Sequence, residues 1–266
     1  MKKFYYPLLT VVLFAACGTL NQMNIFSIED EKNFGNQMYA QIQDAPKDYP
    51  ILDPAKNATA YSHVNRIMLS LLNSGQVNYA KEFEWTIRIV DADVLNAFAC
   101  PGGKVYIYKG LINFLDNEAQ LAGVIAHEIA HIAYRHSTRQ MTKQYGLSAL
   151  TDMLLGQNPN QYVQLATQLA GGLGSLAFSR SDEYEADNGA VRYLSSTDYN
   201  PLGVAGFFQK MVANGQAGGS AVTWLSTHPS SPDRIQKIQE AWATYGSKKG
   251  DDFAARYVQL KNSLPK

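Results

Sequence analysis

The chain has 266 residues, of which 46% are hydrophobic, enough to bury a sizeable core in one large domain or two small ones. Its 23 Lys and Arg residues balance 23 Asp and Glu residues, so the formal net charge at pH 7 is zero. Nucleic-acid-binding proteins usually carry a strongly basic surface, so this balance argues against that class and we expect no nucleic-acid partner.

The first segment, MKKFYYPLLTVVLFAAC, has the layout of an export signal, in which two lysines precede an apolar run. The run is too short to span a bilayer, and it ends in two alanines before Cys17. This ending resembles the lipidation site of a bacterial lipoprotein. We therefore expect residues 1–16 to be a lipoprotein signal peptide, residues 17–26 a lipid-anchored tether, and residues 27–266 a single domain. The alternative is an ordinary signal peptide cleaved near Ala16.

Lipidation at Cys17 would make the chain a lipoprotein of the bacterial cell envelope that faces the periplasm and meets the membrane through its anchor. Gly18 stands where an aspartate retains enterobacterial lipoproteins at the inner membrane, so in a cell of that kind the outer membrane is favoured. With Cys17 acylated, only Cys100 remains and no internal disulfide can form. We expect Cys100 to be a half-buried apolar residue.

Two amphipathic helices are predicted after the tether. Ser27 and Asp30 resemble a capping box, and the apolar residues that follow at helical spacing predict a helix over residues 28–43. A second helix follows, with one apolar face formed by Val64, Ile67, Met68, Leu71 and Leu72.

A small β-sheet is predicted next. FEWTIRIV, residues 83–90, alternates apolar and polar residues as a half-buried strand does. NAFACPGGKVYIYKG then indicates a hairpin, with a strand over Asn96–Cys100, a turn at residues 101–103 and a return strand over Val105–Tyr108.

The chain from Asn117 onward is predicted to be helical. Asn117 can cap a helix together with Gln120. Residues 141–179 are poor in charge and predict a helical hairpin that packs on the core, which we favour over a surface resting on lipid. Asn200-Pro201 and Ser231-Pro232 each indicate a further helix start. The expected fold class is therefore α+β, mostly helical, with a small sheet beside the helix that starts at Asn117.

The motif HEIAH lies within that helix. His127 and His131 are four residues apart, so both imidazoles project from one face and can reach a single ion. Glu128 would then lean toward a water molecule without binding the ion. Burying these polar residues in an apolar helix is costly unless a metal offsets the desolvation. The alternative is that the histidines hydrogen-bond to backbone groups in a tight core.

A catalytic zinc needs a third protein ligand and one open position. A metzincin would have Gly at position 134 and His at position 137, whereas this chain has Tyr134 and Ser137, so that class is excluded. His136 falls at the wrong phase to bind the same ion, and we expect it to orient the end of the helix.

The second usual source of a third ligand is a carboxylate on a later helix. SRSDEYEADNGA offers Glu183 and Asp187, four residues apart on one face. Glu183 would bind the metal, and Asp187 would accept a hydrogen bond from His127 and fix its tautomer. Asp182 and Glu185 are expected to belong to a solvated helix start.

Four ordered motifs resemble those of one known family: NAFACPGGKVYIYKGLI, HEIAHIAYRH, SRSDEYEAD and STHPSSPDRI. They look like the signatures of the zinc metallopeptidase family that includes HtpX, the mitochondrial Oma protease and the lipoprotein LoiP, peptidase family M-48. The resemblance covers about Ser27 to Ala243. It implies a gluzincin-type domain, one Zn²⁺ per chain, and Glu183 as the third ligand.

The resemblance also implies roles for two residues near the C-terminus. In some members the histidine matching His228 lies near the metal, where it fills the open position in a latent state or stabilises the developing oxyanion. Arg234, on the helix that follows, is expected to hold that loop or to bind a substrate carboxylate.

The expected function is endoproteolysis of unfolded or extended polypeptides, with clearance of misfolded envelope proteins as its role. The strand residues Asn96, Ala97, Phe98 and Ala99 are a candidate edge that pairs with an extended substrate. The main competing hypothesis is a lipoprotein chaperone or assembly factor with a latent zinc site. A non-proteolytic zinc hydrolase is a third.

Overall fold

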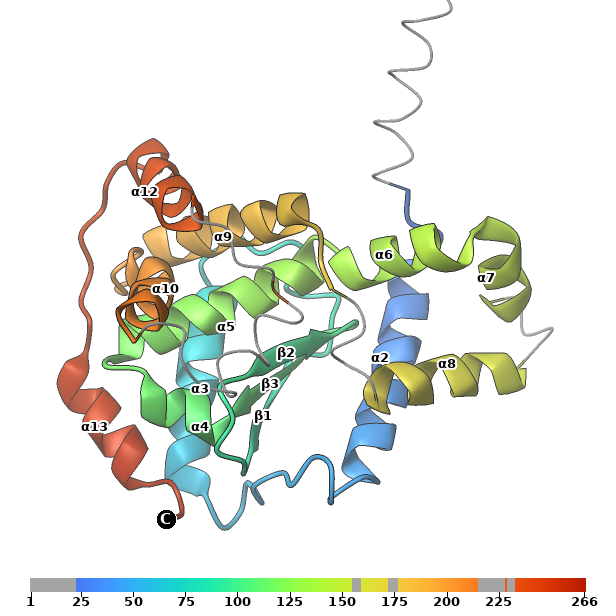
Figure 1. Cartoon of the computed structure of the whole chain (residues 1–266), viewed down its shortest axis with the longest axis horizontal. Helices are drawn as coiled ribbons and strands as arrows, with labels where there is room; N and C mark the ends of the chain where they lie inside the picture. Colours follow the sequence, from blue (N-terminus) through green and yellow to red (C-terminus); the bar gives the residue numbers. More distant parts are fainter. Residues whose placement is uncertain (1–22, 155–158, 172–176, 215–227, 229–232) are drawn as a thin grey trace, which may run out of the picture.

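The computed structural model describes residues 23–154, 159–171, 177–214, 228 and 233–266. Over these residues, helices surround one small sheet, and α5, which carries HEIAH, runs between the sheet and α9 (Figure 1). The predicted fold class, mostly helical α+β with a small sheet beside this helix, is confirmed. The helices are α2 Ile28–Gln43, α3 Ala58–Leu72, α4 Lys109–Phe114, α5 Glu118–Ala133, α6 His136–Tyr145, α7 Leu147–Leu154, α8 Pro159–Gly171, α9 Arg180–Ser195, α10 Gly203–Ala213, α12 Arg234–Thr244 and α13 Ala254–Asn262.

The sheet has three strands in the order β1-β3-β2: β1 (Thr86–Val90), β3 (Lys104–Tyr108) and β2 (Ala97–Cys100). β1 runs parallel to β3, and β2 pairs antiparallel with β3. The predicted strand over residues 83–90 begins only at Thr86. Its partner β3 starts at Lys104, after the predicted turn, so the residues before Thr86 have no strand beside them.

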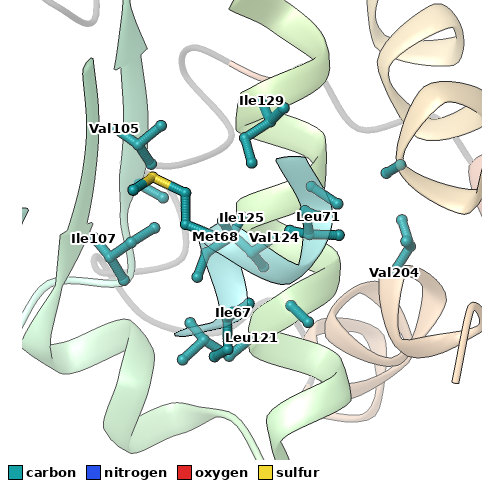
Figure 2. Packing of buried hydrophobic residues seen from close by; sticks show 14 of the residues in the cluster. Ile67, Met68, Leu71, Val105, Ile107, Leu121, Val124, Ile125, Ile129 and Val204 are labelled. Carbon is teal, nitrogen blue, oxygen red and sulfur yellow. The ribbon is translucent and has the colours of Figure 1, made fainter. Parts of the chain in front are cut away.

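The main core is built around α5. Figure 2 shows apolar side chains of α3, β3, α5 and α10 meeting around it. Burying one large apolar side chain completely contributes about 1.5–3 kcal/mol, so this core holds α5 firmly against the sheet. The labelled residues are Ile67, Met68, Leu71, Val105, Ile107, Leu121, Val124, Ile125, Ile129 and Val204.

The caps predicted at Ser27 and Asn117 are present. Ser27 and Asp30 form a capping box at the start of α2. The Asn117 side chain accepts a hydrogen bond from the Gln120 backbone N–H at 3.0 Å at the start of α5. Both ends therefore begin where the sequence indicated, because the capping side chains satisfy backbone donors that the helix leaves open.

The charge-poor region forms the end of α6 together with α7 and α8, and α8 crosses α2 and packs on it (Figure 1). Leu150, Leu165 and Leu169 are buried in a second apolar cluster with Phe34 of α2. The prediction that this region packs on the protein is confirmed for its described residues. None of the helices in the described part of the chain combines the length and apolar character needed to cross a bilayer.

Several predictions of local structure need correction. Cys100 is fully buried, with 0% of its surface exposed, because it faces the cluster beneath α2. α10 begins at Gly203 and not beside Pro201, since the Asn200 side chain accepts a hydrogen bond from the Leu202 backbone in a turn before the helix. Ser231-Pro232 lies outside the described residues.

Other parts were not anticipated. α4 is a short helix that the sequence did not indicate, whereas α13 lies in the region after Asn117 that was predicted to be helical without separate bounds. Within the range predicted as a tether, Asn24 donates a hydrogen bond to Thr138 at 2.8 Å, and Phe26 packs against Phe34. The packed structure therefore includes the described end of that range. Cys17 lies outside the described residues.

Glu118 anchors the buried start of α5 through ionic contacts. Its side chain is 0% exposed and accepts hydrogen bonds from Arg66 at 2.7 and 2.8 Å, Arg256 at 2.9 Å and Tyr199 at 2.8 Å. Burial alone would raise the pKa of Glu118, but Arg66, Tyr199 and Arg256 together lower it below its usual value. The ionised carboxylate therefore stabilises the fold.

We expect Glu118→Gln to lower the free energy of unfolding by about 2–3 kcal/mol at pH 7, because both partly exposed guanidinium groups lose a charged acceptor. The carboxylate contribution is present above the usual pKa of glutamate and is lost as pH falls through the lowered pKa. Urea unfolding at pH 7 and at pH 3 measures this difference, and Glu82→Gln, at an exposed position, is the control. An equal loss of stability for Glu118→Gln at both pH values would contradict this account.

Candidate metal centre

Two neighbouring helices bring the predicted ligands together. α9 begins at a capping box formed by Ser179 and Asp182, and it packs along α5. The first turns of α9 therefore face the last turns of α5, where the HEIAH motif lies. This arrangement places Glu183 directly opposite His127 and His131.

Four buried side chains converge at one point: His127, His131, Glu183 and His228. The Nε2 atoms of His127 and His131 are 3.0 Å apart. Glu183 Oε2 is 3.5 Å from His127 Nε2, and Glu183 Oε1 is 3.5 Å from His131 Nε2. His228 Nδ1 lies 3.1 Å from Glu183 Oε1 and 3.4 Å from His127 Nε2.

These distances suit a zinc ion. Two atoms that each bind a tetrahedral zinc ion at about 2.0–2.1 Å lie about 3.3–3.4 Å apart. The observed separations, 3.0 to 3.5 Å, cluster around that value. Imidazole nitrogens and a carboxylate are also ligand types that zinc prefers. The four side chains therefore fit the metal in both spacing and chemistry.

Asp187 and Arg234 hold the side chains of the cluster in place through hydrogen bonds and ion pairs. Asp187 Oδ1 lies 2.9 Å from His127 Nδ1, as predicted from the spacing on α9. Arg234 donates two hydrogen bonds of 2.7 Å to Asp187, and its Nη1 lies 2.8 Å from Glu183 Oε2. Arg234 is only 1% exposed and braces two carboxylates of the site, Asp187 and Glu183.

The electrostatic balance of the cluster follows from burial and close partners. Burial opposes the charged form of His127, but hydrogen bonds with Asp187 and Glu183 raise its pKa to about 9. Burial would also raise the pKa of Asp187, yet the charge of Arg234 lowers it below its usual value. Burial and the neighbouring His127 lower the pKa of His131. Burial would also raise the pKa of Glu183, but the neighbouring His228 and His127 lower it well below its usual value, so both carboxylates are ionised.

Glu128 lies beside the cluster and does not belong to it. Its Oε1 is 3.5 Å from His228 Nε2 and makes no hydrogen bond among the described residues. Burial raises its pKa above the usual value. A buried carboxylate with a raised pKa and an open acceptor atom suits a general base.

Sequence reasoning missed the role of His136. His136 is not part of the cluster of four, which agrees with the prediction. Its Nδ1 nevertheless lies 2.8 Å from His131 Nδ1, a contact that was not predicted. Its Nε2 lies 3.0 Å from Glu185 Oε2, and burial lowers its pKa. The predicted solvated helix start is wrong for Asp182, which is buried, and holds only in part for Glu185, which is partly exposed; Arg139 and His136 contact both of them. The five-residue spacing between His131 and His136 was the available signal.

Phe178 was also missed, and no sequence signal indicated it. Its ring stacks on the imidazole of His131, with ring centroids 4.0 Å apart. It immediately precedes the cap of α9 and covers one side of the cluster.

The predicted substrate strand is an edge strand. In the described part of the chain, β2 pairs only with β3, so its other edge has no strand beside it. Ala97, Phe98 and Ala99 lie in β2, whereas Asn96 precedes it. A pocket that is partly open to solvent lies between this strand and His228. Its described lining is mostly apolar and includes Phe34, Met38, Phe98, Met141, Leu169 and Phe178.

Comparison with known proteins identifies relatives of this chain. Residues 58–242 match the model of peptidase family M48. The mitochondrial metalloendopeptidase OMA1 of Schizosaccharomyces pombe is 30% identical over 220 residues, covering 82% of this chain and 63% of that protein. The β-barrel assembly-enhancing protease of Yersinia pestis is 33% identical over 156 residues, covering 55% and 32%. The metalloprotease YcaL of Escherichia coli is 27% identical over 176 residues, covering 65% of each.

The matched region thus spans less than two thirds of the length of each of these relatives. The family match covers more than half of this chain and includes both α5 and α9. The matched relatives are named as metalloproteases, and the buried cluster of His127, His131, Glu183 and His228 is suited to hold a metal ion. The chain therefore belongs to peptidase family M48, a family of metalloendopeptidases.

Proposed function

We propose that the chain is a zinc-dependent endopeptidase that cleaves unfolded or extended polypeptides. The observation that carries this proposal is the buried cluster in which His127, His131 and Glu183 converge beside Glu128. Membership of a family of metalloendopeptidases supports the same conclusion. The identity of the ion as zinc is supported by the ligand types and their spacing.

A zinc ion held there would act as a Lewis acid on the scissile carbonyl and would lower the pKa of a nearby water molecule. Glu128 takes a proton from the attacking water and later delivers it to the leaving amine. Asp187 accepts a hydrogen bond from His127 Nδ1, so Nε2 is the ring nitrogen that would face the ion. Arg234 holds Asp187 and Glu183 in place.

The substrate is proposed to add to the free edge of β2. Main-chain hydrogen bonds along such an edge depend little on sequence, which suits a chain that has lost its fold. The apolar pocket beside β2 and His228 would take one large apolar side chain, a group that unfolding exposes. Substrate recognition would therefore combine main-chain hydrogen bonds, which accept many sequences, with one apolar side-chain contact.

We further propose that the enzyme is a periplasm-facing lipoprotein, anchored at Cys17 and held at the outer membrane in preference to the inner, that removes misfolded envelope proteins. The support for this role is the segment up to Cys17, which resembles a lipoprotein signal, and similarity to the bacterial β-barrel assembly-enhancing protease. Metabolic labelling with a radioactive fatty acid tests the anchor. Label in the wild type and none in Cys17→Ser is expected, and equal labelling would contradict it.

The activity is tested by digestion of unfolded casein with purified protein. We expect cleavage that a chelator abolishes and that added zinc restores, with about one zinc per chain in the active sample. Cleavage that persists after zinc has been removed completely would contradict the proposal.

A second candidate, a latent protease that only binds extended chains, is favoured by one observation. His228 Nδ1 occupies the corner of the cluster that catalysis needs open. If His228 closes the site, His228→Ala should cleave casein faster than the wild type. A lower rate would instead assign His228 the oxyanion role. Casein binding without cleavage by both proteins would favour the chaperone hypothesis.

A further inference from the structure

The two histidines of HEIAH present their second ring nitrogens to different partners. His127 Nδ1 lies 2.9 Å from the carboxylate of Asp187. His131 Nδ1 faces away from the cluster and lies 2.8 Å from His136 Nδ1. A histidine that binds a metal through one nitrogen almost always donates from the other, so His131 also needs an acceptor.

His136 is itself held by a carboxylate. Its Nε2 lies 3.0 Å from Glu185 Oε2, and Arg139 donates a hydrogen bond to the same oxygen at 2.8 Å. A carboxylate only accepts, so His136 must donate from Nε2. A neutral imidazole that donates from Nε2 offers Nδ1 as an acceptor, which is the atom facing His131.

We infer that His136 and Glu185 form a positioning relay that fixes the tautomer and orientation of His131. In this relay Glu185 accepts from His136 Nε2–H, His136 Nδ1 accepts from His131 Nδ1–H, and His131 Nε2 is left facing the cluster. Asp187 accepts the Nδ1–H of His127 directly. For His131 the acceptor of Nδ1–H is His136, which Glu185 in turn holds in the required tautomer. The inference rests on the proposed role of His131 as a zinc ligand.

A competing interpretation is that His136, Asp182 and Glu185 hold a second metal ion, since their donor atoms lie close together. Arg139 argues against it. Its Nη2 lies 2.8 Å from Glu185 Oε2 and 3.3 Å from Asp182 Oδ1, so a guanidinium already neutralises both carboxylates. A cation placed there would meet that positive charge at close range. The group is therefore complete as a hydrogen-bonded network.

The burial of His136 supports the relay. The residue is 1% exposed, and its ring contacts the rings of His131 and Phe178. Water therefore cannot easily replace it as the acceptor for His131. Losing it would leave a buried donor without a partner and the His131 ring free to turn.

The direct test is nuclear magnetic resonance of the zinc-loaded full chain labelled with ¹⁵N-histidine, which reports the protonated nitrogen of each ring. We expect His131 to carry its proton on Nδ1 and His136 on Nε2. A proton on His136 Nδ1 would overturn the relay whatever the activity of the protein.

Zinc release to an excess of chelator gives the functional measurement. Because changing an outer partner of a ligand costs about 10–100-fold in metal affinity, His136→Leu should release zinc about 10–100-fold faster than the wild type. His136→Gln keeps an amide oxygen that can accept from His131 and should recover much of the loss. Glu185→Leu, at a partly exposed position, should also speed release and is the second variant if His136→Leu does not fold.

His63→Gln is the matched control. His63 is also a largely buried histidine, and its Nδ1 lies 3.1 Å from Arg66 Nη2, remote in the sequence from the cluster. Its substitution should leave zinc release unchanged even if stability falls. Normal release from both His136→Leu and Glu185→Leu would overturn the relay, whereas normal zinc binding by His131→Ala would overturn the proposed site itself.

Discussion

Glu128→Gln is expected to keep its zinc and to lose proteolysis by about 10²- to 10⁴-fold, the usual contribution of a general base. Glutamine has nearly the same shape as glutamate but cannot take a proton from water. Glu128 is not one of the four clustered side chains, so the ligand set is unchanged. Zinc analysis and casein digestion of the same sample measure both effects.

The stability of this variant provides an internal check. Burial raises the pKa of Glu128, so the fold disfavours its charged form. Replacing the carboxylate by a neutral amide should therefore leave the unfolding temperature unchanged or raise it. Glu82→Gln, at an exposed position, should match the wild type in all three measurements. A Glu128→Gln protein that digests casein at the wild-type rate would rule out the proposed base.

Glu183→Ala is expected to lose zinc binding. The substitution removes one of three proposed ligands, so affinity should fall by more than the roughly 10–100-fold that follows loss of an outer partner. It also takes a carboxylate away from Arg234, which lies 2.8 Å from Glu183 and is almost fully buried. Stability should therefore fall as well, because a buried charge loses one of its two acidic partners.

Competition with a coloured chelator measures the affinity, and urea unfolding measures the stability. Glu183→Gln separates the two effects, since the amide keeps an acceptor for Arg234 while removing the negative charge that attracts the ion. Glu240→Ala, at an exposed position on α12, is the control. If Glu183→Ala bound zinc as tightly as the wild type, the third ligand would have to be a residue other than Glu183.

The periodic parts of the fold could be predicted because they depend on local rules. The capped starts of α2 and α5 follow from side chains that bond to nearby backbone groups, and the HEIAH spacing follows from the helical repeat. Helix geometry also puts Asp187 on the same face of α9 as Glu183, so once Glu183 was assigned to the metal, Asp187 could be expected beside His127.

What could not be predicted depends on contacts between distant segments. Arg234 braces Asp187 and Glu183 only because α12 packs on α9, which no local pattern reveals. The relay through His136 and Glu185 likewise needs the start of α6 to lie next to the start of α9. An acidic helix start that faces solvent and one that joins such a relay can have the same local sequence, and only the packing distinguishes them.

The most direct test of the metal centre is a crystal structure of the zinc-loaded protein, with anomalous diffraction measured at the zinc absorption edge. The account predicts one strong peak at about 2.0–2.2 Å from His127 Nε2, His131 Nε2 and a Glu183 oxygen. A peak that lies elsewhere, or one that Glu183 does not reach, would contradict it.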